Sequence, residues 1–175
     1  LIEATIKSNN DRKIHMADKI IAAAGGDVKG KTIAVLGLTF KPNTDDMREG
    51  ASLSILQALI SAGAKIRAYD PQGMKEAAHY FEKQKEHIVW CDDAYSTMQG
   101  ADMLLILTEW NEFRSLELKQ VRSLLRQPLV VDLRNIYKRQ DMKAHGFHYV
   151  SVGRQEVIPG EPWIADLNIE SEWAA

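Results

Sequence analysis

The chain has 175 residues, which is enough to bury one sizeable hydrophobic core and gives no sign of two independent domains. Its 22 Lys and Arg residues nearly balance its 24 Asp and Glu residues, and the net charge of -2 argues against a general role in binding nucleic acid or a membrane surface. Any recognition of an anion must therefore be local to one site. The single cysteine, Cys91, excludes an internal disulfide and is typical of a reducing cytoplasm.

The sequence carries neither of the two common signals for membrane targeting. No stretch approaches the roughly 20 apolar residues needed to cross a bilayer, and the first residues lack the basic-then-apolar layout of a signal peptide. We therefore expect a cytoplasmic protein without a membrane partner. Because the sequence begins with leucine, we also expect it to be an excerpt from a longer chain.

Apolar residues alternate between helical and extended spacing along the chain. Ile2–Ala24 is predicted to form a long helix, which Gly25 and Gly26 would end. Its polar first half, about Lys7–Lys13, is either solvated or the cut end of an interdomain or dimer helix. The later predicted elements are the strand Thr32–Leu36, the helix Leu53–Ala62, the strand Lys65–Tyr69, the helix Met74–Lys83, the strand Ile88–Trp90, the helix Asp93–Gln99, the strand Met103–Leu107, the helix Leu116–Leu125, the strand Leu129–Leu133, a helix around Met142 and the strand His148–Val152.

This alternation predicts an α/β fold with a doubly wound, mainly parallel, Rossmann-like sheet and helices on both faces. Such sheets bind ligands outside the carboxyl ends of the strands, near the point where the strand order reverses. The residues that follow the strands include Asp70, Thr108–Trp110 and Asp132–Asn135. Asp70 stands before Pro71, which favours a capping role over the alternative of a carboxylate that binds a ribose.

The stretch Gly37–Ser52 joins the first strand to the following helix and is the strongest candidate for a site. The first N–H groups of a helix lack intrahelical partners and carry partial positive charge, which suits a phosphate-bearing ligand. Lys41 is the best single candidate for a phosphate contact, although a solvated surface lysine would look the same. Arg48 either pairs with one of the acids Asp45 and Asp46 or presents its guanidinium to a ligand.

The dinucleotide-binding pattern G-x-G-x-x-G is absent, since Gly37 is followed by Leu38, Thr39 and Phe40. A diphosphate would therefore be held by cationic side chains and loop N–H groups instead of a glycine cradle. No metal site is expected, because the neighbouring acids Asp45 and Asp46 have no histidine or further carboxylate at ligand spacing.

Several motifs, in order and at matching spacing, resemble the C-terminal domain of the UDP-glucose 6-dehydrogenase family. They are GLTFKPNTDDMRE, GAKIRAYDP, LILTEWNEF, VVDLRN and YVSVGR. The resemblance covers about Lys31–Arg154, and the preceding helix resembles the end of the long helix that joins the two Rossmann-like domains of that family. Sister families that oxidise GDP-mannose or UDP-N-acetylmannosamine share the Phe40-Lys41 core, so they remain alternatives.

The resemblance implies roles for individual residues. In that family the N-terminal domain holds NAD, and the C-terminal domain holds the UDP part of the substrate in a cleft between the two. By position, Phe40, Lys41 and Arg134 correspond to residues that contact the UDP-sugar, and Arg48 to one that reaches NAD. Thr108–Trp110 corresponds to a family signature at the edge of the cleft, to which no contact is assigned.

The family's reaction oxidises UDP-glucose to UDP-glucuronate with two NAD and a catalytic cysteine, which the resemblance places upstream of this sequence. Cys91 is not that cysteine, because negative charge at Asp92 and Asp93 disfavours its thiolate. We therefore expect no catalytic residue here and an isolated chain that binds UDP weakly and turns nothing over. A non-catalytic nucleotide-binding module and a purely structural interaction domain are the remaining alternatives.

The resemblance also implies an organisation of the chain and its partners. Residues 1–26 would be the end of the interdomain and dimerisation helix, residues 27–154 the UDP-binding domain, and residues 155–175 an irregular tail. The implied partners are a UDP-sugar, the N-terminal NAD-binding domain and a second copy of the protein in a homodimer formed through the helix.

Overall fold

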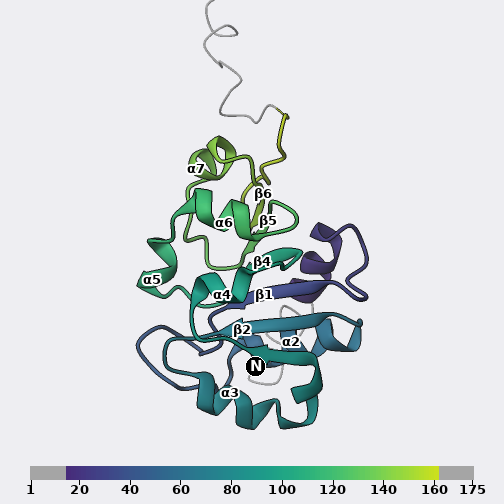
Figure 1. The fold of residues 1–175 in the computed structure, drawn as a ribbon, viewed down its shortest axis with the longest axis vertical. Coiled ribbons are helices and arrows are strands. Elements are labelled where there is room, and N and C mark those ends of the chain that lie inside the picture. The colour runs from purple at the N-terminus through teal and green to yellow at the C-terminus, as the bar shows by residue number, and fades with distance from the viewer. Residues whose placement is uncertain (1–14, 162–175) are drawn as a thin grey trace, which may run out of the picture.

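A computed structural model describes residues 15–161 of the chain. In this part, six parallel strands form one sheet in the order β3-β2-β1-β4-β5-β6, with helices on both faces (Figure 1). The strands are β1 (Thr32–Leu36), β2 (Lys65–Tyr69), β3 (Ile88–Trp90), β4 (Met103–Ile106), β5 (Leu129–Asp132) and β6 (His148–Ser151). The helices are α2 (Ala51–Ser61), α3 (Met74–Tyr80), the 3₁₀ helix η1 (Glu82–His87), α4 (Ala94–Met98), α5 (Asn111–Arg114), α6 (Leu118–Leu124) and α7 (Arg139–Ala144). The predicted doubly wound fold is confirmed.

The central strands are buried on both faces, which explains their continuous apolar sequences. In β1, Ile33 and Val35 belong to one hydrophobic cluster, and Ala34 and Leu36 belong to the other. The first cluster packs α2 and α3 against the sheet, and the second packs α4, α5, α6 and α7 against the opposite face. The two clusters together form the core on which the strand-end loops rest.

The described part of the predicted long helix comprises residues 15–23, where Ala17 and Ile20 are buried in or beside the first cluster. Gly25 and Gly26 follow with φ of 92° and 90°, and their N–H groups bond to carbonyls of the last helical turn. Both glycines therefore end the helix as predicted. Residues 2–14 of the predicted helix lie outside the described residues, and Ala24 lies in the turn that follows the helix.

Several helix bounds differ from the sequence-based expectations. The predicted helix Met74–Lys83 ends at Tyr80, and the chain continues as η1. The predicted helix Leu53–Ala62 begins two residues earlier, at Ala51. The helix α5 was not predicted, because its four residues are too few to show a helical period.

The described tail, up to Glu161, continues beyond β6 and folds back on it. Val157 pairs with Tyr149 in an antiparallel bridge, with N–H···O distances of 2.8 and 2.9 Å. Val157 is 1% exposed and belongs to the second cluster, so this edge of the sheet is partly covered. The apolar tail residues Trp163, Leu167 and Trp173 lie outside the described part.

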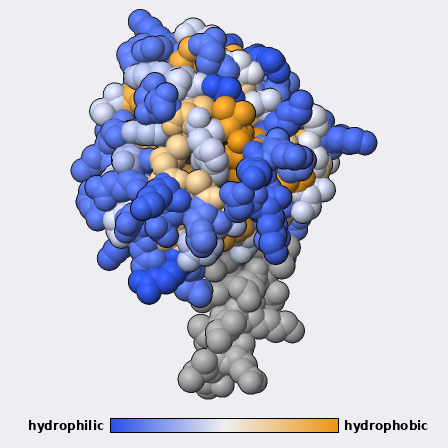
Figure 2. All heavy atoms as spheres, turned by 60° about the horizontal axis from the view of Figure 1, so that its bottom comes forward, coloured by the Kyte–Doolittle hydropathy of each residue, from blue (hydrophilic) through white to orange (hydrophobic). Residues whose placement is uncertain are grey.

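The surface of the described residues is mostly polar. On the face shown in Figure 2, hydrophilic residues surround a smaller hydrophobic area. The large apolar side chains that are most exposed are those of Phe40, Tyr80 and Val89, at 54%, 44% and 53%. Within residues 15–161, no helix combines the length and apolarity that a membrane crossing requires.

Candidate functional site

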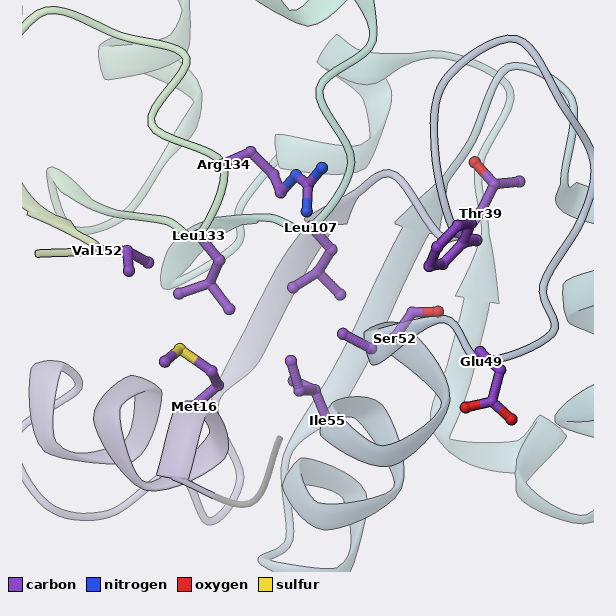
Figure 3. Close-up of a pocket in the computed structure, with 11 residues that line it drawn as sticks. Met16, Thr39, Glu49, Ser52, Ile55, Leu107, Leu133, Arg134 and Val152 are labelled. Atoms are coloured by element: carbon purple, nitrogen blue, oxygen red, sulfur yellow. The ribbon is translucent and has the colours of Figure 1, made fainter. Parts of the chain in front are cut away.

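A cavity of about 520 Å³ lies at the carboxyl ends of the central strands (Figure 3). Its wall combines the segments that follow β1, β4, β5 and β6 with the first turns of α2 and with the N-terminal helix. The lining residues include Met16, Phe40, Ile55, Leu107, Arg134 and Val152.

The position of the cavity follows from the topology. The chain runs outward from β1 through β2 to β3 and then returns to β4 on the other side of β1. The strand order therefore reverses between β1 and β4, and the loops that leave these two strands diverge there. The cavity lies at this point, where the sequence predicted a ligand site.

The cavity wall combines apolar side chains with one cation, Arg134, and one carboxylate, Glu49. In Figure 3 the side chains of Leu107, Ile55 and Met16 converge from three elements, while Arg134 extends above Leu107 from the loop after β5. Phe40 also lines the cavity, although its ring is largely exposed. An exposed aromatic ring and a guanidinium at the same cavity can serve a ligand with both a flat base and a phosphate.

The guanidinium of Arg134 is held by Glu109, which follows β4. Arg134 Nε and Nη2 donate to the two carboxylate oxygens at 2.5 and 2.6 Å, in a bidentate pair. This pair lowers the pKa of the Glu109 carboxyl, because Arg134 favours its charged form. Both residues follow strands in the sequence, but no sequence pattern predicts the contact between them.

A fully buried carboxylate, Asp132, fixes the backbone of the loop that carries Arg134. Its Oδ1 accepts a hydrogen bond from Arg134 N at 2.9 Å, and its Oδ2 accepts from Ile136 N at 2.8 Å and from the Tyr149 hydroxyl at 2.7 Å. Burial, together with the nearby Asp132 charge, raises the pKa values of the Tyr149 and Tyr137 hydroxyls. Both phenols therefore remain protonated donors at neutral pH.

The same loop is joined to the end of β6 by Asn135, whose φ of 55° lies in the left-handed region. Its amide donates to the Val152 carbonyl at 3.0 Å, and Val152 N donates to the Asn135 side-chain oxygen at 2.9 Å. This two-way pairing fixes the cavity wall at Val152.

On the opposite side, Asp70 fixes the segment that leads to Phe40. Asp70 is fully buried at the end of β2, and its Oδ2 accepts from Leu38 N at 2.7 Å and from Thr39 N at 3.1 Å. Its Oδ1 accepts from Gln72 N and Gly73 N, which caps the turn before α3. The carboxylate is therefore occupied by structural contacts, and the alternative of a ribose-binding group is not supported.

The structure places the other candidates around the cavity and not in its wall. Lys41 directly follows Phe40 and is exposed, but it is not among the described residues that line the cavity. Arg48 forms a bidentate pair with Asp46, at 3.0 Å from Nε to Oδ1 and 2.9 Å from Nη2 to Oδ2. This pairing lowers the pKa of Asp46 to about 2. Arg48 lines a separate hollow of about 340 Å³ that also includes Tyr80.

The space beside Gly37, at the start of the loop after β1, is filled by Thr108. Gly37 has φ of 87°, and a Cβ at this position would lie 2.5 Å from Thr108 Cβ. The absence of a side chain thus serves the close approach of Thr108, which leaves no open glycine cradle.

A metal site and a reactive cysteine are the two other kinds of chemical site considered within residues 15–161. No group of three or more His, Cys, Asp or Glu side chains there is arranged to hold a metal ion. Cys91 is buried, with Sγ 3.7 Å from the Val89 carbonyl.

Comparison with known proteins gives consistent matches. The model of the family described as "UDP-glucose/GDP-mannose dehydrogenase family, UDP binding domain" matches residues 34–139. UDP-glucose 6-dehydrogenase of Rhizobium meliloti (strain 1021) is 49% identical over 156 residues, which are 89% of this chain and 35% of that protein. UDP-glucose 6-dehydrogenase TuaD of Bacillus subtilis (strain 168) is 43% identical over 162 residues, which are 93% of this chain and 34% of that protein.

The fold is similar to that of a solved UDP-glucose dehydrogenase from the archaeon Pyrobaculum islandicum. The TM-score is 0.62 at 26% identity, over 75% of this chain and 28% of that one. The chain thus spans about a third of the length of the relatives that it matches.

Proposed function

This chain belongs to the UDP binding domain family of the UDP-glucose/GDP-mannose dehydrogenases, and we propose that it binds the UDP part of a UDP-sugar in the cavity at the ends of β1, β4 and β5. The full-length protein would be an NAD-dependent UDP-glucose 6-dehydrogenase that converts UDP-glucose to UDP-glucuronate. The similarity to the two bacterial UDP-glucose 6-dehydrogenases supports this substrate.

The observation that carries the proposal is the presence of Phe40 and Arg134 in the wall of one cavity at the topological switch point. The ring of Phe40 is free to contact a base or sugar face, and the guanidinium of Arg134 is suited to a phosphate oxygen. The exposed Lys41, which directly follows Phe40, would supply a second positive charge once a diphosphate is bound.

The remaining roles concern parts of the protein beyond this chain. NAD would be bound mainly by a preceding domain, since the loop after β1 lacks the G-x-G-x-x-G pattern, and Arg48 would reach toward that cofactor from outside the cavity. Residues 1–26 would join the two domains and contribute to a homodimer, residues 27–154 would form the UDP-binding domain, and residues 155–175 would follow as a tail. The catalytic cysteine would also lie in the preceding domain, so this chain alone would not reduce NAD.

Titration calorimetry with UDP tests the proposal on the chain as it stands. Replacing Arg134 with alanine is expected to weaken UDP binding by about 10- to 100-fold, because a hydrogen bond to a charged group contributes about 1.5 to 3 kcal/mol.

Replacing Phe40 with alanine is expected to weaken binding as well, since a base or sugar face loses its contact. GDP is expected to bind more weakly than UDP.

Arg126→Ala is the matched control. Arg126 is another exposed arginine paired with an acid, with Nη1 3.6 Å from Asp102 Oδ1. Asp102 directly precedes β4, so this pair lies at the amino ends of the strands, away from the cavity at their carboxyl ends. This variant makes the same change in charge and should leave UDP affinity nearly unchanged. Equal losses in the Arg126 and Arg134 variants would mean that net charge, and not the cavity, determines binding.

A further inference from the structure

The residues Thr108–Trp110 follow β4 and do not line the cavity. Their side chains instead bond to the two loops that do, directly or through Asp70. Strand β4 lies between β1 and β5, so a segment leaving its end can reach both neighbouring loops. Glu109 faces the β5 side and holds Arg134. Thr108 and Trp110 face the β1 side, and both are buried, at 1% and 6% exposure.

Trp110 reaches the segment before Phe40 through the buried carboxylate of Asp70. Its indole Nε1 donates to Asp70 Oδ2 at 3.1 Å, and the same oxygen accepts the N–H groups of Leu38 and Thr39. One carboxylate oxygen therefore joins the end of β4, the end of β2 and the segment that follows β1. Without the indole, Asp70 would lose a donor that satisfies and orients its buried charge.

Thr108 holds the other side of the same segment. Its hydroxyl donates to the Thr39 carbonyl at 2.7 Å, across the close approach that Gly37 permits. The Leu38 carbonyl accepts from the Ser52 hydroxyl at 2.5 Å. The N–H and C=O groups of both Leu38 and Thr39 are thus bonded to side chains of Asp70, which follows β2, of Ser52 in α2 and of Thr108, which follows β4.

Phe40 comes directly after this fixed segment, and its ring is 54% exposed. Packing therefore contributes little to holding the ring in place, and the backbone that carries it determines where it lies. Phe40 N itself donates to the Asp46 carbonyl at 2.8 Å, which fixes the next peptide in the loop.

We propose that Thr108 and Trp110 are positioning residues for the nucleotide, which act on it through Thr39 and Phe40 without touching it. The inference rests on the proposed binding of UDP in the cavity. It assigns a role to two buried side chains outside the cavity wall and predicts that ligand affinity depends on their hydrogen bonds, in addition to any effect on stability.

Calorimetric titration of the chain with UDP tests this role, at a temperature well below the unfolding transition of every variant. Trp110→Phe keeps an aromatic ring and removes the N–H donor, and Thr108→Val keeps the shape and removes the hydroxyl. Each is expected to raise the Kd for UDP by about 2- to 10-fold, the range that corresponds to one net hydrogen bond. Thr108→Ser, which keeps the hydroxyl, is expected to lose less affinity than Thr108→Val.

Met98→Ala is the control for a purely structural effect. Met98 is fully buried in α4, so its truncation lowers the melting temperature without altering the hydrogen bonds of the Leu38–Thr39 segment. Its Kd for UDP should match that of the wild-type chain. The positioning role is overturned if Trp110→Phe and Thr108→Val bind UDP as the wild type does, or if Met98→Ala loses as much affinity as they do. Should one of the two not fold, the other decides. Absence of UDP binding by the wild-type chain would instead overturn the proposed function, and this inference with it.

Discussion

Asp70→Ala is expected to lower the free energy of unfolding by about 3 to 5 kcal/mol, a loss seen when a buried polar network is broken. The carboxylate accepts hydrogen bonds from Leu38 N, Thr39 N, Gln72 N, Gly73 N and Trp110 Nε1. Alanine leaves these donors without their carboxylate partner at a position where Asp70 is fully buried. Urea unfolding followed by circular dichroism measures the change.

Asp93→Ala is the matched control for Asp70→Ala. Asp93 also follows a strand and caps the next helix, since its Oδ1 accepts from Ser96 N at 2.8 Å, but its side chain is exposed. The loss of such an exposed N-cap costs about 1 kcal/mol. If the two variants lose similar free energy, Asp70 is an ordinary cap and does not organise the site.

Gly37→Ala is expected to lower the free energy of unfolding by about 3 kcal/mol or more, from strain and overpacking together. Gly37 has φ of 87°, where a side chain is disfavoured, and its Cβ would lie 2.5 Å from Thr108 Cβ and 2.6 Å from Thr108 N. The second contact is with backbone, so it can be relieved only by moving the ends of β1 and β4 apart. Because these strand ends frame the cavity, UDP affinity is expected to fall as well.

Gly146→Ala separates the two causes. Gly146 has a similar φ of 72°, but a Cβ there would meet nothing within 4 Å. The cost should therefore be backbone strain alone, about 1 kcal/mol, with no change in UDP affinity. Equal destabilisation of the two variants in urea would show that the close approach of Thr108 to Gly37 has no energetic consequence.

The strands could be predicted well from the sequence, and Thr32–Leu36, Lys65–Tyr69 and Ile88–Trp90 have the predicted bounds. Burial explains the signal of the central strands β1, β4 and β5, whereas β2 and β3 are only partly buried. Strands that pack on both faces, such as β1, need short apolar runs that glycine, proline or charged residues interrupt, and these runs are visible in one sequence. The helix α5 has no such signal, since its four residues make little more than one turn. The 3₁₀ helix η1 has none either, because none of its six residues is buried and no apolar face marks it.

The candidate site was predictable in part. Because parallel strands end on the same side of a sheet, the β1 loop and Arg134 were expected near one another, and Phe40 and Arg134 do line one cavity there. Lys41, the phosphate contact that the sequence favoured, lies outside the cavity wall. The sequence could not predict this, because residue spacing does not determine the direction of a side chain in a loop. Met16 and Val152 were not anticipated, since they come from segments whose approach depends on the tertiary fold.

The supporting hydrogen bonds were the least visible feature of the sequence. An aspartate before a proline correctly indicated that Asp70 caps the following turn. The donors from Leu38, Thr39 and Trp110 lie far away in sequence and meet Asp70 only because β1 neighbours both β2 and β4. No pattern in a single sequence signals such a convergence. The only sign of it was the resemblance of Thr108–Trp110 to a family signature at the edge of the cleft, to which no contact had been assigned.

The most direct test of the account is the map of amide chemical-shift changes when UDP is added to the ¹⁵N-labelled chain. Binding in the cavity predicts that the largest changes occur at Phe40, Arg134 and Val152, which approach it from three different loops. The amides around the separate hollow that Lys19 and Glu156 line should change little. The largest changes at that hollow, or no change at saturating UDP, would contradict the assignment of the cavity as the nucleotide site.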